Sequence, residues 1–109
     1  MNTPWGQSDS ETKLRVGPGV NDEIISVGTP SHGGYFVPDH LLSRIPANQQ
    51  AWAAKWSQSP NWYEEDCCWA AVALAFPSLF NDNARVLAAD LVKTYCGSSV
   101  HFLPHCRPS

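Results

Sequence analysis

The sequence has no cluster of basic residues and no long apolar run. Its seven Lys and Arg residues are scattered along 109 residues, and the formal net charge is -3. Binding to the nucleic-acid backbone requires clustered positive charge, so we expect no direct nucleic-acid binding. No stretch of about 18 apolar residues occurs, so we also expect no membrane span.

Signatures of targeting and of common cofactors are missing as well. The opening residues 1–6 show no basic start followed by an apolar run, which predicts no signal peptide and a cytoplasmic location. The four cysteines would then be mostly thiols. No phosphate loop, dinucleotide fingerprint or Gly-x-Ser-x-Gly elbow is present, so nucleotide enzymes and α/β-hydrolases find no support and no cofactor is expected.

The sequence is rich in apolar and aromatic side chains for its size. Five Trp, three Tyr and four Phe accompany a charged fraction of only 16%, which argues against disorder. This composition also suggests that some aromatic surface is left over for a partner. The length predicts a single domain over 1–109, with an N-terminal arm at 1–12 and an irregular tail at 97–109.

Strand patterns come first along the chain. Residues 13–16 alternate polar and apolar, residues 23–27 are rich in β-branched side chains, and residues 35–37 form a third short apolar run. Turn clusters separate the three segments. Because sequential strands with short loops usually pair antiparallel, we predict a three-stranded meander.

Helical patterns follow in the second part of the chain. We predict a short helix at 38–45, a second at 47–56 with Trp52 and Trp56 on one face, and a last helix at 84–95. Residues 81–83 would cap the last helix, whose stripe would be Leu87, Leu91 and Tyr95.

The stretch between these helices is the one around which the chain is organised. It starts with two alternative N-caps, Ser59 before a proline or Asn61, and continues without polar interruption from Trp69 to Phe76. A helix that is apolar on all sides belongs in the interior. The predicted fold class is therefore α+β, a small three-stranded antiparallel sheet packed against three or four helices with a buried central helix.

A candidate site combines a loop histidine with the polar start of this central helix. His32 lies in Ser-His-Gly-Gly, and Glu64, Glu65, Asp66 and Cys67 would lie in the first helical turn. Such groups together are the inventory of a Cys-His-acid nucleophile or an acid/base pair. The alternatives are a turn-forming histidine with carboxylates placed for the helix dipole, or a binding surface formed by the same residues.

A second set of potential ligands lies near the C-terminus. Cys96, His101, His105 and Cys106 are zinc-type side chains, but their spacing lacks a Cys-x-x-Cys knuckle. We therefore expect an exposed, irregular tail without metal, and a zinc site and a disulfide between Cys96 and Cys106 are the two alternatives.

The five tryptophans divide into core and surface candidates. Trp69 is expected in the core, whereas Trp5 and Trp62 are candidate interface anchors, because Trp is common among residues that dominate binding energy.

Four blocks of the sequence resemble the successive blocks of an uncharacterised domain family found in proteins of bacteriophages, plasmids and other mobile elements. The blocks are Thr3-Pro-Trp-Gly6, Thr29-Pro-Ser-His-Gly-Gly34, Trp62-Tyr-Glu-Glu-Asp-Cys67 with Trp69, and Phe76-Pro-Ser-Leu-Phe80. The resemblance covers roughly residues 3–82. The family has no known activity, so what the resemblance implies is a genomic setting.

The candidate residues and this setting together lead to three functional expectations. The first is an anti-defence inhibitor, similar to anti-CRISPR proteins, which binds a host protein or protein–nucleic-acid complex through acidic and aromatic surface. The binding residues would be Trp5, His32, Trp62, Glu64, Glu65 and Asp66. The second is a small hydrolase or transferase that uses His32, Cys67 and one of the carboxylates. The third is a structural or regulatory accessory domain.

Overall fold

The structure, a computed structural model, describes residues 1–97. The tail predicted for 97–109 lies outside the described residues from position 98 onward, and so do His101, His105 and Cys106. Cys96 is a free cysteine, so the alternative of a disulfide between Cys96 and Cys106 is wrong. No helix among the residues that the structure describes is long and apolar enough to cross a membrane.

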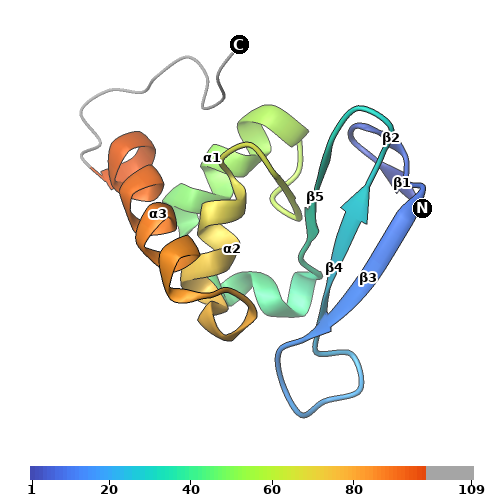
Figure 1. Cartoon of the computed structure of the whole chain (residues 1–109), viewed down its shortest axis with the longest axis horizontal. Coiled ribbons are helices and arrows are strands. Elements are labelled where there is room, and N and C mark those ends of the chain that lie inside the picture. Colours follow the sequence, from blue (N-terminus) through green and yellow to red (C-terminus); the bar gives the residue numbers. More distant parts are fainter. Residues whose placement is uncertain (98–109) are drawn as a thin grey trace.

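The main sheet has four antiparallel strands in the order β3–β4–β5–β6 (Figure 1). They are β3 (Ser10–Arg15), β4 (Glu23–Gly28), β5 (Gly33–Phe36) and β6 (Trp62–Glu64). The first three form the predicted meander, with short turns between sequential strands. The prediction of three strands was wrong, because the short β6 returns from later in the chain and pairs with β5.

A second, two-stranded sheet lies in the N-terminal segment that the sequence indicated as an arm. The strands are β1 (Asn2–Thr3) and β2 (Gly6–Gln7). The Thr3 hydroxyl accepts from the Trp5 amide at 3.0 Å and donates to the Gly6 carbonyl at 2.7 Å. Gly6 has a φ of +117°, which favours glycine, so Trp5 is placed at the tip of a defined turn.

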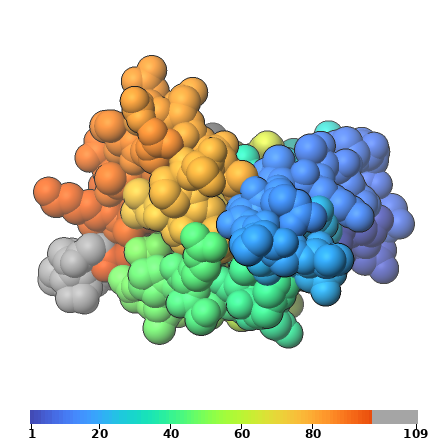
Figure 2. Space-filling view, turned by 90° about the horizontal axis from the view of Figure 1, so that it is seen from below, coloured from blue at the N-terminus to red at the C-terminus, as the bar shows by residue number. Residues whose placement is uncertain are grey.

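The helices lie together on one side of the main sheet (Figure 1). In chain order they are the 3₁₀ turn η1 (Asp39–Arg44), α1 (Ala47–Ser57), α2 (Trp69–Ala75), the 3₁₀ turn η2 (Pro77–Leu79), α3 (Asp82–Val92) and the π-helical turn η3 (Lys93–Gly97). Seen from below, the turn between β3 and β4 lies beside η1 (Figure 2). His40 Nε2 and Asp22 Oδ1, 3.2 Å apart, join the two segments.

The predicted central helix is shorter than expected and begins later. Residues 62–64 form β6 and residues 65–68 form a turn, so only Trp69–Ala75 is α-helical. Neither Ser59 nor Asn61 caps a helix. The Asn61 side-chain amide instead donates to the Val37 carbonyl at 2.7 Å, which ties the chain to the end of β5.

The burial of this helix is as predicted. Ala70, Ala71, Val72 and Ala73 are all 0% exposed, and α2 lies between the sheet and α3 in Figure 1. Small side chains let the neighbouring elements approach α2 closely. The core around it is completed by large side chains from every layer, including Ile24, Val37, Ile45, Trp52, Tyr63 and Phe76.

For α3, the N-cap was predicted correctly and the apolar stripe was not. The Asn81 side chain accepts from the Ala84 amide at 2.8 Å and caps the helix, as predicted. The predicted apolar stripe is shifted, because Leu87 is 52% exposed while Ala88 and Val92 are buried.

Candidate functional site

Pairing of β5 with β6 brings the Ser-His-Gly-Gly bend beside the predicted carboxylates. Gly34 is the register partner of Glu64, and the Glu65 amide donates to the Gly33 carbonyl at 2.9 Å. The two segments are far apart in the sequence. Their juxtaposition, which the candidate site required, is therefore confirmed, although a strand rather than a helix provides it.

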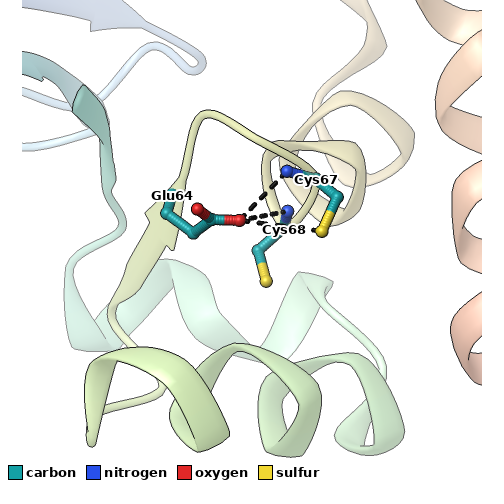
Figure 3. Close-up of side chains that lie close together, drawn as sticks. All are labelled: Glu64, Cys67 and Cys68. Atoms are coloured by element: carbon teal, nitrogen blue, oxygen red, sulfur yellow. Dashed lines mark hydrogen bonds between the residues drawn. The ribbon is translucent and has the colours of Figure 1, made fainter. Parts of the chain in front are cut away.

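Glu64 is buried and organises the turn that leads into α2. It is 5% exposed, and its Oε1 accepts from the Cys67 amide at 3.0 Å and the Cys68 amide at 3.4 Å (Figure 3). These amides would otherwise be unsatisfied at the start of the helix. Glu64 thus acts as a cap from a strand that precedes the helix.

The environment of Glu64 disfavours its charged form. Burial raises the pKa of the Glu64 carboxyl, and the nearby Asp66 carboxyl raises it further. The amides of Cys67 and Cys68 act in the opposite direction because they stabilise the carboxylate. Burial is the largest of these contributions.

The two adjacent cysteines are core residues. Cys67 is 1% and Cys68 0% exposed, and burial raises the pKa of the Cys68 thiol well above its usual range. Donor atoms of Glu64, Cys67 and Cys68 lie within 4.8 Å of one another, a spacing that a metal ion can use. However, Cys67 is disulfide-bonded, so the predicted thiol state is wrong at this position. The trio is therefore better described as a buried capping network than as a metal centre.

His32 forms the tight turn between β4 and β5. Its amide donates to the Thr29 hydroxyl at 3.0 Å, and its carbonyl accepts from that hydroxyl and from the Thr29 amide, both at 2.7 Å. These bonds match the turn-forming alternative. The buried, oxidised sulfur of Cys67 offers no thiolate to an imidazole, so this geometry gives the Cys-His reaction no support.

The two glycines after His32 permit close packing by the chain itself. A Cβ at Gly33 would lie 2.9 Å from the Val27 carbonyl, and one at Gly34 would lie 2.5 Å from the Tyr63 carbonyl. We expected the glycines to admit a ligand or another chain. The segments that approach belong to the protein itself: β4 at Gly33, and β6 with the Trp5 ring at Gly34.

Trp5 and Trp62, the candidate interface anchors, lie against each other. Their ring centroids are 5.7 Å apart in an edge-to-face arrangement, and both side chains are half-buried. Phe36 extends the group, with its ring 4.9 Å from that of Trp62. We call Trp5, Phe36 and Trp62 the aromatic strip.

Trp69 lies on the other side of the sheet. It packs against the core and lies 5.7 Å from the Phe80 ring, but it is half-buried rather than enclosed. The expectation of a core position holds in part.

Glu65 and Asp66 are exposed, unlike Glu64. Glu65 follows the end of β6, where its backbone bonds to Gly33. Asp9 lies beside the same end of the sheet, because its amide donates to the Gly28 carbonyl at 2.8 Å and Gly28 pairs with Gly33. We call Asp9, Glu65 and Asp66 the acidic end of the sheet.

The contribution of Phe36 was missed from the sequence. The local pattern of residues 35–37 predicts only a short strand. Alternation with the neighbouring Tyr35, which packs on Phe80 at 5.7 Å, is the signal that places Phe36 on the opposite face.

These features define a small α+β domain with a buried capping network and an aromatic strip on its sheet. The chain belongs to a family described as a domain of unknown function, DUF7007, whose model matches residues 1–100. No curated protein and no solved structure shows significant similarity to the chain. The resemblance to an uncharacterised domain family is thereby confirmed.

Proposed function

We propose that this protein acts by binding another protein, and that the aromatic strip is the centre of its contact surface. The observation that carries the proposal is the contact of Trp62 with both Trp5 and Phe36 at 5.7 and 4.9 Å. Partly exposed aromatic rings held rigidly by one another are well suited to anchor an interface, because little conformational entropy is lost on binding.

The strip faces away from the helices. Side chains alternate across a strand, and Tyr35 and Tyr63 point toward the helical layer, where Tyr63 is 0% exposed. Their neighbours Phe36 and Trp62 consequently lie on the outer face. A partner can reach that face without displacing any helix.

The acidic end of the sheet provides electrostatic complementarity. Glu65 and Asp66 are exposed and follow Trp62 closely in the chain, and Asp9 lies beside the same end of the sheet. A partner with basic residues around an apolar contact would match this arrangement. Such charges guide association and specificity more than they add affinity.

For the class of partner, we propose a host defence complex, which the protein would inhibit by occupying a basic surface that otherwise binds nucleic acid. The net charge of -3 supports this assignment. So does the resemblance of its sequence blocks to those of a family found in phage, plasmid and other mobile-element proteins. Inhibition would be stoichiometric, without turnover.

Affinity capture from a bacterial host lysate tests the proposal. The wild-type protein and the Trp62→Ala and Glu65→Lys variants serve as baits, with folding checked by circular dichroism. We expect one host protein or complex at near-stoichiometric level with the wild type and a loss of at least about tenfold with each variant.

Asp90→Lys is the matched control, because Asp90 is exposed on α3, a helix of the layer on the other side of the sheet from the strip. It should capture the partner as the wild type does. Capture that is equally reduced by Asp90→Lys, or unaffected by Trp62→Ala and Glu65→Lys, contradicts the proposed surface. Absence of any stoichiometric partner contradicts the binding function.

A further inference from the structure

A hollow of about 400 Å³ continues the aromatic strip along the outer face of the sheet. Phe36 belongs to both features, because it contacts Trp62 at 4.9 Å and also lines the hollow. The complete lining consists of Lys13, Asn21, Glu23, Ile25, Phe36, Pro38 and His40. The space is comparable to that of a small-ligand site or a receptor for one side chain.

The floor of the hollow is apolar. Ile25 and Phe36 are register partners on adjacent strands, so their side chains lie next to each other on the same face. Pro38 continues this surface where β5 has ended. All three are half-buried. An apolar side chain of moderate size placed here would exclude water from both surfaces.

The charges at the rim are compensated with one exception. Glu23 pairs with Arg15 at 3.6 Å, and His40 pairs with Asp22 at 3.2 Å. Lys13 forms no ion pair with any residue that the structure describes.

The carboxylate nearest to Lys13 on its own strand face is also engaged elsewhere. Glu11 accepts from the N-terminal ammonium at 3.0 Å and from the Ser8 hydroxyl at 2.6 Å. Lys13 contributes to the lowered pKa of Glu11 through its charge, but no direct ion pair among the described residues occupies its ammonium. It can therefore still pair with an anion at the edge of the apolar floor.

We propose that this hollow binds the C-terminal residue of a partner protein, with its apolar side chain on Ile25 and Phe36 and its carboxylate at Lys13. Lys13 is the register partner of Ile25, so it borders the floor on the neighbouring strand. A C-terminal apolar residue carries its side chain and its carboxylate on one Cα, and it can therefore contact the floor and Lys13 together. Capture of a terminal carboxylate is an established mode of peptide recognition. The inference rests on the proposed protein-binding function and names the part of the partner that enters the hollow.

Titration of the ¹⁵N-labelled protein with N-acetylleucine, observed by NMR, tests the inference directly. This probe carries the side chain and the terminal carboxylate, whereas N-acetylleucinamide carries the same side chain without the charge. We expect saturable shifts at the amides of Lys13, Ile25 and Phe36. The acid should bind at least about threefold more tightly than the amide, as an exposed ion pair allows.

Two variants separate the roles of charge and floor. Lys13→Gln should equalise the two affinities while amide binding persists, and Ile25→Thr should weaken both probes. Lys93→Gln, an exposed cation in η3, is the control and should retain the preference. The inference is overturned if the probes cause no saturable shift at these amides, or if the wild type binds acid and amide equally.

This experiment uses no partner, so its outcome is distinguishable from that of the capture experiment. Failure of the probes leaves the aromatic strip as a contact surface and removes only the assignment of the C-terminus. Normal probe binding without any captured partner would instead contradict the protein-binding function and leave the hollow as a carboxylate-binding site.

Discussion

The indole of Trp5 lies directly over the backbone of Gly34. A Cβ at this glycine would approach Trp5 Cη2 to 2.6 Å, so no larger residue fits without displacing the ring. Val27, the register partner of Gly34, is only 4% exposed. The N-terminal hairpin thus packs on the outer face of the sheet through the Trp5 ring, which occupies the space that a side chain at position 34 would need.

Gly34→Ala is expected to destabilise the protein by at least about 2 kcal/mol, because the added methyl would also lie 2.5 Å from the Tyr63 carbonyl and 2.9 Å from Glu64 Cα. Backbone atoms cannot rotate away as a flexible side chain does. Chemical denaturation of the variant and the wild type measures the effect.

Gly28→Ala is the matched control for this substitution. Its Cβ would meet Ser10 Oγ at 2.6 Å, and that hydroxyl can move to another rotamer. The control should cost less than about 1 kcal/mol. Equal destabilisation by the two variants would contradict the close packing of the Trp5 ring against Gly34.

Glu64→Gln is expected to change how stability depends on pH. The folded-state pKa of Glu64 is raised, so its carboxyl contributes fully to the stability of the wild type at a pH below the unfolded-state pKa, where it is protonated in both states. The wild type loses this contribution to its free energy of unfolding as the pH rises through the folded-state pKa. Glutamine keeps an oxygen for the Cys67 and Cys68 amides but cannot ionise. The free energy of unfolding of the variant should therefore rise relative to that of the wild type between acidic and neutral pH. The expected rise is about 1.4 kcal/mol for each unit by which the pKa is raised.

Urea denaturation at pH 4, 5.5 and 7 follows this difference. Glu65→Gln serves as the control, since Glu65 is exposed and does not cap the turn, and its difference from the wild type should vary little with pH. A Glu64→Gln variant that loses stability relative to the wild type as pH rises would contradict the assignment.

Asn81→Ala should destabilise the protein by about 1 kcal/mol, because the Ala84 amide loses its capping acceptor. Asn83→Ala, two residues later in the same helix, removes an exposed asparagine from a helical position and should be neutral or slightly stabilising. Thermal unfolding of both variants checks the prediction, which a milder effect of Asn81→Ala than of Asn83→Ala would refute.

Cys96 should react slowly with alkylating reagents in the folded protein. Partial burial raises the pKa of its thiol from 9.0 to about 11, so roughly 100-fold less thiolate is present at pH 8 than for an exposed thiol of ordinary pKa. Iodoacetamide labelling followed by peptide mapping of Cys96, in native buffer and in urea, measures the difference. Equal rates in the two conditions would be inconsistent with a half-buried thiol.

Segments with strong local signals were predicted well from the sequence. The β-branched run 23–27 became β4, the helix former segment 47–56 became α1, and Asn81 caps α3. Each outcome depends on the residues themselves and their immediate neighbours. The expected antiparallel pairing of the first three strands also follows from short connections.

The fourth strand was missed because its signal is not local. Residues 62–64 follow a Ser-Pro pair and precede a long apolar run, both typical of helix starts, and only pairing with β5 makes them extended. The same effect shifted the stripe of α3, where small Ala88 faces the tightly packed α2 and Leu87 does not.

The proximity of the His32 bend to Glu64 was predicted correctly, whereas the different environments of the three carboxylates were not. Sequence reasoning brought the bend at His32 beside Glu64, and it also raised the structural alternatives that the geometry supports. The sequence predicted the same exposed position, at the start of a helix, for Glu64, Glu65 and Asp66. In the structure Glu64 is 5% exposed whereas Glu65 and Asp66 are exposed, a difference set by the direction of the chain at the end of β6.

The late position of β6 has a consequence for synthesis of the chain. The register partner of Gly34 on the β5 edge is Glu64, which is synthesised 30 residues later. Until the ribosome has released that segment, Phe36 and Trp5 both lack their contact with the indole of Trp62. The nascent sheet is consequently open on its β5 side, and its closure is a long-range event that should come late in folding.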